Sequence, residues 1–399
     1  MSKTQAVPVV QIEPASPSLR SRMRDFFLIK KMNTPLGYFL ILALATLIAV
    51  ATAKAGIIVG ALVLAMTVGL PVLYCLIVFP KVGMTIVLTV SYLIMWILRM
   101  NIVNFPLGTL MDGMEVLLVL NIFIQQKRKK DWAIFKGPVT AIIIIWILYN
   151  LAELGNPVAA STTAWAYTVR TVALVMVMYF VFLYNIRTKE FIRFLLKLWL
   201  GLALFGAVYA TKQQYFGFFP FEEAYLHSDP NIELLLFIGG VWRKFSIFSD
   251  PVVFAYTMAV TSLLCIGLMT GPISKKKKII LFLLICFYLS NMLYSGTRGA
   301  FVLVPAAMIL YGILKFSKKI LFIGAAAAAI MVVLIFIPTS NGTLYRFQSA
   351  FKPSDDASYK VRKINQKRIQ PFIVSHPMGV GLGSTGIWGQ KFSPGCRIC

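Results

Sequence analysis

Long apolar stretches separated by short polar connections fill the chain from residue 36 onward. A helix needs about 20 apolar residues to cross the roughly 30 Å hydrocarbon layer of a membrane. Scanning with that length predicts about eleven spans, at residues 36–53, 56–79, 83–99, 107–125, 138–154, 166–185, 191–211, 251–271, 279–294, 299–315 and 319–338. The pattern therefore predicts an all-α, polytopic transmembrane helix bundle over residues 34–338.

The basic residues of the short connections orient these spans. Basic clusters precede the first span and recur at Lys127–Lys130, Arg187–Arg193, Lys275–Lys278 and Lys315–Lys319. Threading the spans places all of these clusters on one face, which the positive-inside rule assigns to the cytoplasm. Residues 1–33 are then a disordered, basic cytoplasmic N-terminus, and residues 339–399 form an external basic loop.

Composition agrees with a membrane protein. Hydrophobic residues make up 59% of the 399 residues, charged residues make up 13%, and the mean hydropathy is +0.80. A soluble domain of this length needs far more polar surface. The formal net charge of +25 is scattered along the chain rather than gathered in one patch, so we expect no nucleic-acid partner.

Two long segments are predicted to be external. One connects the seventh and eighth spans, and the other follows the last span. The first, residues 212–250, contains F-G-F-F-P-F-E-E-A-Y, whose aromatic side chains we expect at headgroup depth. In the second, residues 339–399, apolar positions recur at helical spacing and predict a short amphipathic helix against the membrane. These positions are Val361, Ile364, Ile369, Phe372 and Ile373. We expect the native chain to continue beyond Cys399.

The stretch Y-S-G-T-R-G-A-F places Arg298 in a short external turn between two spans. Its guanidinium presents five donors in a rigid fork that matches phosphate oxygens, although an arginine here could also anchor the helix end in lipid headgroups. Arg243 lies on the same face, and the two arginines form a predicted clamp for a diphosphate. Asp250 and Pro251 stand at the start of the span at 251–271. Asp250 fits the N-cap position of that helix and Pro251 fits its first position.

Three ordered motifs resemble the O-antigen ligase and polymerase superfamily. They are R-K-F-S-I-F-S-D-P-V-V-F-A, S-G-T-R-G-A-F, and S-Y-K-V-R followed by I-V-S-H-P-M-G-V-G-L-G, and the resemblance covers residues 200–390. It implies a multi-pass glycosyltransferase of the bacterial inner membrane that takes a glycan from undecaprenyl diphosphate on the periplasmic side. The implied acceptor is lipid A–core for a ligase and another lipid-linked glycan for a polymerase.

The resemblance also implies roles for individual residues. Arg243 and Arg298 would hold the pyrophosphate, Arg362 would belong to the helix of the external loop, and Gly379, Gly381 and Gly383 would shape the external cavity. Ligases of this family carry a histidine beyond the glycine-rich turn that activates the acceptor. This chain has only His227 and His376. His376 is therefore a candidate general base, although its place beside Pro377 favours a structural role.

Four acidic residues of the first external segment are further candidates for a general base. They are Glu222, Glu223, Asp229 and Glu233, and we expect them to be ordinary solvated charges. No pair of carboxylates has the spacing of metal ligands, so we expect neither a metal nor a cofactor. The implied partners are an undecaprenyl-diphosphate-linked glycan, its acceptor and membrane lipid.

A transporter or lipid flippase is the main alternative. It predicts charged or discontinuous segments near the middle of the membrane. Pro71 and Pro305 could interrupt helices, but they do not occupy matching halves of the chain, and prolines are tolerated in spans. Arg170 and Lys197 lie close enough to span ends to reach headgroups. A scaffold without chemistry is a third possibility, and it gives no reason for two external arginines.

Overall fold

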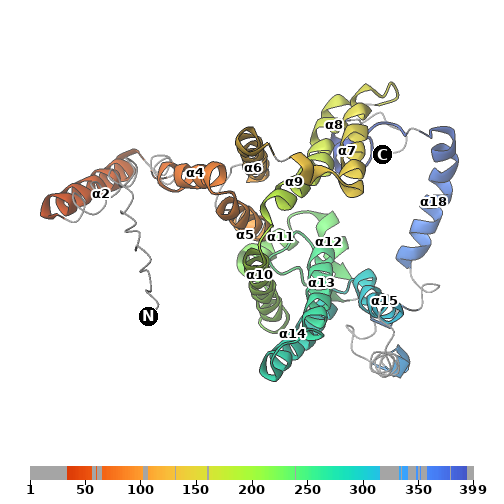
Figure 1. Cartoon of the computed structure of the whole chain (residues 1–399). Helices are drawn as coiled ribbons and strands as arrows, with labels where there is room; N and C mark the ends of the chain where they lie inside the picture. The colour runs from red at the N-terminus through yellow and green to blue at the C-terminus, as the bar shows by residue number, and fades with distance from the viewer. Residues whose placement is uncertain are drawn as a thin grey trace, which may run out of the picture. The chain divides into compact units, whose positions relative to one another are not determined.

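The structure is a computed structural model (Figure 1). It describes residues 34–55, 60, 65–101, 107–130, 132–159, 161–238, 240–314, 332–333, 335–339, 347–348, 351, 357–377 and 379–392. The predicted cytoplasmic tail at 1–33, the basic connection at 315–319, most of the predicted span at 319–338 and the final residues 393–399 lie outside the described residues.

The chain divides into two compact units, Met1–Tyr74 and Cys75–Cys399. In the first unit, α2 (Pro35–Ala55) is a helix of 21 residues over the first predicted span. A π-helical turn, η2 (Ala65–Gly69), then leads into α4 (Leu70–Val78). Pro71 is the second residue of α4, just beyond that turn, and prolines and π-bulges are both usual sites of helix distortion.

Seven helices among the described residues are long and apolar enough to cross a membrane. They are α5 (Pro80–Arg99), α6 (Leu107–Lys129), α7 (Pro138–Ala152) with η4 (Glu153–Gly155), the continuous α8 (Thr162–Val169), η5 (Arg170–Leu174) and α9 (Val175–Asn185), α10 (Lys189–Tyr215), α13 (Pro251–Met269) and α14 (Lys275–Tyr294). Met66–Val78 and α15 (Arg298–Leu314) are shorter apolar helices. The predicted helical membrane architecture is confirmed, whereas the predicted number of about eleven spans is not.

The lysine run at the start of α14 differs from the sequence prediction. We expected Lys275–Lys278 to form a connection, but these residues make up the first turn of α14, behind Ser274. Lysine has a good intrinsic helix propensity and a long side chain, so it can extend a helix beyond the apolar layer. Hydropathy marks where the apolar residues begin, not where the helix begins.

The segment between α10 and α13 contains small elements that the sequence pattern did not predict. Two short helices, α11 (Pro220–Leu226) and α12 (Pro230–Leu236), precede a hairpin of β1 (Phe237–Ile238) and β2 (Val241–Trp242). The strands pair antiparallel. The sequence I-G-G-V at the hairpin is a turn signal.

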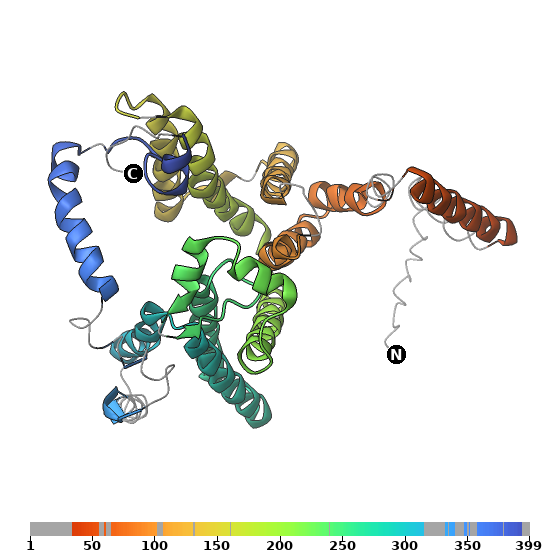
Figure 2. The ribbon, with the colours of Figure 1, turned by 180° about the vertical axis from the view of Figure 1, so that it is seen from behind.

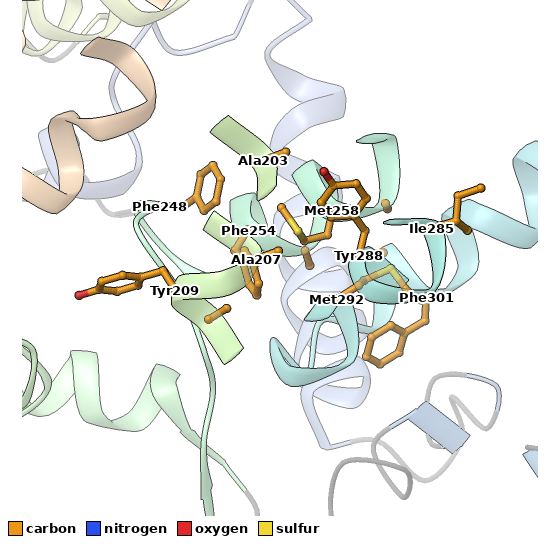
Figure 3. Packing of buried hydrophobic residues seen from close by; sticks show 14 of the residues in the cluster. Ala203, Ala207, Tyr209, Phe248, Phe254, Met258, Ile285, Tyr288, Met292 and Phe301 are labelled. Atoms are coloured by element: carbon orange, nitrogen blue, oxygen red, sulfur yellow. The ribbon is translucent and has the colours of Figure 1, made fainter. Parts of the chain in front are cut away.

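The main hydrophobic core of the described residues joins α10, α13, α14 and α15 (Figure 3). Ala203 and Ala207 of α10 are fully buried, and these small side chains allow α10 close approach to α13 and α14. Phe254 of α13 and Tyr288 of α14 are also fully buried. The core therefore fixes the ends of the helices around the segment that separates α10 from α13.

Contacts in the second unit join helix ends that the threading assigns to one face. At the predicted cytoplasmic ends, Lys81 Nζ lies 5.3 Å from the centre of the Phe191 ring. At the predicted external ends, the Arg99 guanidinium donates to the carbonyl oxygen of Ser246 at 3.1 Å. Lys81 and Phe191 lie at the starts of α5 and α10, which the threading runs in the same direction.

The C-terminal described helices are α18 (Ala357–Ser375) and α19 (Gly386–Phe392). The predicted helix of the external loop is thus present, and Arg362 lies on it with an exposed side chain. The Phe347 ring packs 5.4 Å from the Phe301 ring of α15, whereas α19 packs against α8. In both views α18 runs between the neighbourhood of α15 and that of α8 (Figure 1 and Figure 2).

Candidate functional site

The turn between α14 and α15 is shaped by its own short side chains. The Ser295 hydroxyl oxygen accepts from the backbone N–H of Thr297 at 3.1 Å, and Gly296 adopts a φ of 61°, which costs glycine little. The Thr297 hydroxyl donates at 3.1 Å to a backbone carbonyl at the start of α13. Arg298 follows as the first residue of α15 and is half-buried.

Arg243, which directly follows β2, contacts the same turn. Its Nε donates to the Ser295 carbonyl at 2.8 Å and its Nη2 donates to the Thr297 hydroxyl at 3.0 Å. Its Nη1 donates to the Leu235 carbonyl at 3.2 Å. The structure thus brings Arg243 to the stretch that carries Arg298, and we call residues 295–298 the arginine turn.

The position of Arg298 is unfavourable for the helix that it begins. A cation near a helix N-terminus opposes the helix dipole, at a cost of roughly 0.3–1 kcal/mol when exposed. The unpaired N–H groups of a first helical turn already favour an anion. Arg243 and Arg298 add two positive charges to this turn, which favour an anion there.

Asp250 and Pro251 act as helix caps. One Asp250 carboxylate oxygen accepts from the backbone N–H groups of Val252 at 2.7 Å and Val253 at 3.0 Å, and Pro251 occupies the first position of α13. Both roles agree with the capping interpretation of the sequence. Their contribution to the site is to fix the start of α13 beneath the arginine turn.

Glu222 is the residue that the sequence interpretation described wrongly. We expected a solvated charge, but its side chain is 0% exposed. Oε1 accepts from the Tyr209 hydroxyl at 2.9 Å and from Gln213 Nε2 at 2.6 Å, and Oε2 accepts from the backbone N–H of Phe219 at 2.8 Å. Pro220 and Glu222 at the first and third positions of α11 are a recognisable capping signal that could have identified this acid.

A half-buried arginine, Arg99, and a buried lysine, Lys244, accompany this carboxylate, and the sequence interpretation assigned a role to neither. Arg99, at the end of α5, donates to the carbonyls of Ser246 and Phe248 and lies 4.2 Å from the centre of the Phe245 ring. Burial lowers the pKa of Lys244, and the negative charge of Glu222 partly opposes that shift. Glu222 interacts electrostatically with both cations. The charged cluster of Arg99, Glu222 and Lys244 therefore joins α5, α11 and the segment after β2.

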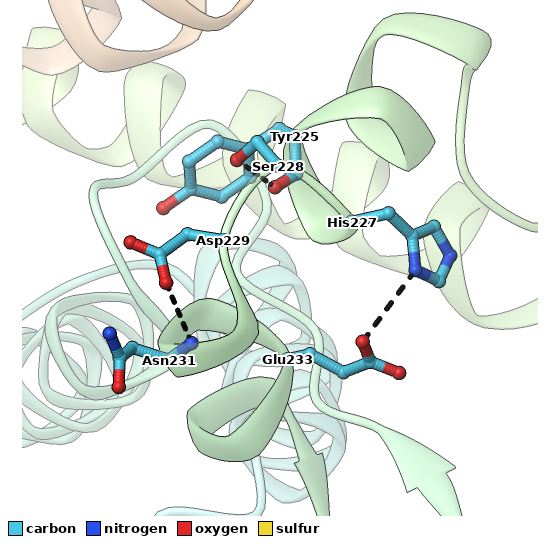
Figure 4. A network of polar contacts seen from close by, with 6 residues as sticks. All are labelled: Tyr225, His227, Ser228, Asp229, Asn231 and Glu233. Atoms are coloured by element: carbon cyan, nitrogen blue, oxygen red, sulfur yellow. Dashed lines mark hydrogen bonds and ion pairs between the residues drawn. The ribbon is translucent and has the colours of Figure 1, made fainter.

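The other acids of this segment have exposed, local roles (Figure 4). Asp229 caps α12, because its carboxylate accepts from the backbone N–H of Asn231 at 2.8 Å. Glu233 Oε2 lies 4.0 Å from His227 Nδ1, and both side chains are more than half exposed. As expected from the sequence, Asp229 and Glu233 are solvated, and so is Glu223.

The glycines of H-P-M-G-V-G-L-G adopt left-handed conformations, with φ of 79° at Gly379, 91° at Gly381 and 81° at Gly383. A Cβ on Gly381 would lie 2.5 Å from Ala159 Cβ, and one on Gly383 would lie 2.5 Å from the Ala164 carbonyl oxygen. The expected tight backbone path is therefore present. It packs against the start of α8, not against the arginine turn.

His376 ends α18 and interacts with its own helix. Its Nδ1 lies 2.9 Å from the Ser375 hydroxyl and 3.2 Å from the Phe372 carbonyl oxygen, and its ring stacks on Phe372 with 4.2 Å between ring centres. Its backbone carbonyl accepts from Gly379 at 2.8 Å. These contacts describe a helix-ending residue and fit the structural role that Pro377 favoured.

Arg170 does not simply reach for headgroups as the sequence suggested. Its Nε lies 2.8 Å from Asp112 Oδ2, and both side chains are partly buried between α6 and η5. Arg170 also begins the π-helical stretch η5, which interrupts the helix from Thr162 to Asn185. An ion pair within two spans is an observation that hydropathy alone did not reveal.

Within the described ranges, no group of three or more His, Cys, Asp or Glu side chains could hold a metal ion. The chain matches no protein-family model, no curated protein and no solved structure.

Proposed function

We propose that this protein transfers a glycan from undecaprenyl diphosphate to a lipid A–core or glycan acceptor on the periplasmic face of the bacterial inner membrane. The N-terminus would be cytoplasmic, and the chemistry would be that of an O-antigen ligase. The alternative acceptor, another lipid-linked glycan, would make it a polymerase of the same superfamily.

One observation supports the proposal most strongly. Arg243 donates two hydrogen bonds to the arginine turn that carries Arg298, at the ends of two apolar helices. Two guanidinium groups at this depth suit a diphosphate that is tethered to the membrane by its polyprenyl chain. The position is unfavourable for α15 alone, so a role for Arg298 in anion binding explains its presence.

The diphosphate is a good leaving group, so the enzyme mainly needs to stabilise the negative charge that develops on it. Fixed guanidinium groups in a site shielded from water can do this without a metal. Three protein acceptors orient Arg243, which makes Arg243 the residue that holds the turn and Arg298 the residue that we assign to phosphate contact. A general base must then reach the acceptor hydroxyl, and His376 is the candidate that the family resemblance offers.

The test measures binding of undecaprenyl diphosphate to the purified chain in detergent, together with glycan attachment in cells. Replacing Arg298 by alanine should weaken binding by about 10- to 100-fold, the equivalent of one charge-assisted hydrogen bond. Arg298→Lys should recover only part of that loss, because lysine cannot offer the planar fork. Lipid-linked glycan should accumulate in cells that carry either variant.

Arg193→Ala is the matched control. Arg193 is an exposed arginine near the start of α10, at the predicted cytoplasmic end, and its loss should leave binding unchanged. If Arg298→Ala binds undecaprenyl diphosphate as the parent does and the cells make normal surface glycan, the proposal is wrong.

The ion pair of Asp112 with Arg170 favours a second candidate, a transporter or lipid flippase. Ionisable groups and an interrupted helix inside the membrane are typical of transport pathways. A transporter would lose movement of substrate across vesicle membranes when Asp112 is replaced by asparagine. The transferase should keep its undecaprenyl diphosphate affinity in that variant.

A further inference from the structure

The end of α12 and the hairpin that follows expose apolar side chains although they lie outside the long helices. Leu234 is 75% exposed and Leu235 is 64% exposed, whereas Leu236 is buried against Phe245 and Leu226. The exposed set continues through Phe237, Ile238 and Val241. We call Leu234, Leu235, Phe237, Ile238 and Val241 the apolar tip.

The short segment before the apolar tip has the opposite character. Residues 227–233 contain His227, Ser228, Asp229, Asn231 and Glu233, all exposed, with the local polar contacts of Figure 4. The exposed side chains of residues 227–241 therefore change from polar to apolar after Glu233. Such a gradient suits an element that has one end in water and the other in an apolar medium.

The apolar medium is best identified as the membrane itself. The segment starts from the end of α10 at Tyr215 and returns to α13 at Pro251, so it is tethered at the level where two apolar helices end. Trp242 lies beside the tip, 4.9 Å from the Phe237 ring, and Tyr215 and Tyr294 pair at the adjacent helix ends. Aromatic side chains of this kind collect at the interface between headgroups and hydrocarbon.

The positive charge beside the apolar tip also suits a lipid surface. Arg243 lies at the tip, where it donates to the Leu235 carbonyl, and it carries charge of the sign that phosphate headgroups attract. A second copy of the chain would instead bring like charges together at this position. An apolar patch with the Arg243 guanidinium at its edge therefore fits lipid better than self-association.

We infer that the apolar tip inserts into the external leaflet and sets the depth of the arginine turn. The connection is direct, because Arg243 donates both to the Leu235 carbonyl in the tip and to Ser295 and Thr297 in the turn. Seating the tip among acyl chains places this guanidinium at the level of the lipid phosphates. The inference concerns lipid contact and holds whichever reaction the site performs.

The experiment uses the full chain with its five native cysteines replaced, reconstituted in vesicles of phosphatidylethanolamine and phosphatidylglycerol. Leu234→Cys or Leu235→Cys carries an environment-sensitive fluorophore, and Asn231→Cys on the same short helix is the control. Lipids bearing a spin label in the acyl chain should quench the probe at 234 or 235 several-fold more than the probe at 231. Aqueous iodide should show the reverse order.

Three results would overturn the inference. The first is equal quenching of the two positions by the lipid-borne label, and the second is stronger iodide quenching at 234 than at 231. The third is disulfide-linked dimers through Leu235→Cys without lipid quenching, which would identify a second copy as the partner. The Leu235→Cys chain must elute from size exclusion as the cysteine-free parent does, which separates loss of insertion from loss of fold.

Discussion

At the scale of single residues, the sequence motifs selected two arginines that the fold brings to one turn, but they did not predict burial. Arg243 and Arg298 were selected from two separate motifs, and both contact or belong to one turn. Glu222 was expected to be solvated like the other acids of its segment, because its burial depends on Tyr209 and Gln213 from a different helix. A neighbouring pair of glutamates looks identical in sequence even when the fold buries one and exposes the other.

Replacing Glu222 by glutamine tests the buried carboxylate. Donors converge on both Glu222 oxygens from Tyr209, Gln213 and Phe219, so an amide nitrogen must face a donor. Loss of the charge also leaves the buried Lys244 and the half-buried Arg99 without the nearby negative charge of Glu222. We expect the free energy of unfolding to fall by about 3–5 kcal/mol, measured as a lower thermal midpoint in detergent.

Glu223→Gln is the control for this change. Glu223 is the next residue along α11 and is exposed, so its replacement should stay within about 0.5 kcal/mol of the parent. Similar midpoints for the two variants would show that the Glu222 cluster contributes little to stability.

At the scale of elements, hydropathy located the long helices but not their ends. The predicted spans at 83–99 and 107–125 match α5 and α6 closely, whereas α14 begins at Lys275 and α10 continues to Tyr215. At about 1.5 Å per residue, the 27 residues of α10 exceed the thickness of the hydrocarbon layer. Polar helix ends carry no apolar signal, so hydropathy cannot place them.

The glycine-rich segment gives a test at this scale. Alanine at Gly383 would adopt an unfavourable φ and also collide with the start of α8, whereas alanine at Gly379 has the same strain and nothing within 4 Å. Left-handed strain costs about 1–2 kcal/mol in either variant, and the collision adds to it only at Gly383. We expect Gly383→Ala to release α19 from α8.

Limited proteolysis between α18 and α19 measures this release, because cleavage reports local opening. Gly383→Ala should be cut several-fold faster than Gly379→Ala. Equal cleavage rates would mean that the close approach to α8 does not hold α19 in place.

At the scale of the whole molecule, the sequence predicts an order and a direction for the spans, but it does not predict which helices are neighbours. Facing surfaces of helices in lipid are as apolar as their lipid-facing surfaces, so hydropathy does not mark the packing face. The pairing of Asp112 with Arg170 and the bonds of Arg99 to the segment before α13 belong to this unpredicted level. Both join segments far apart in the sequence.

The predicted orientation can be tested with a membrane-impermeant maleimide on intact cells. In the cysteine-free chain, Asn231→Cys should react from outside, because the threading puts it on the external face. Lys276→Cys, an exposed residue in the first turn of α14, should react only after the membrane is opened. The opposite pattern would invert the topology and remove the arginine turn from the periplasm.

The two attachments of the C-terminal segment limit how the molecule can move. Phe347 packs on Phe301 of α15, and Trp388 stacks on Tyr167 of α8 with 4.4 Å between ring centres. Between them lies α18, whose 19 residues make a rod of about 28 Å at the usual helical rise. A movement that separates α8 from α15 would therefore break one of these aromatic contacts or be taken up by the connections at the two ends of α18, so the C-terminal segment couples the two helices mechanically.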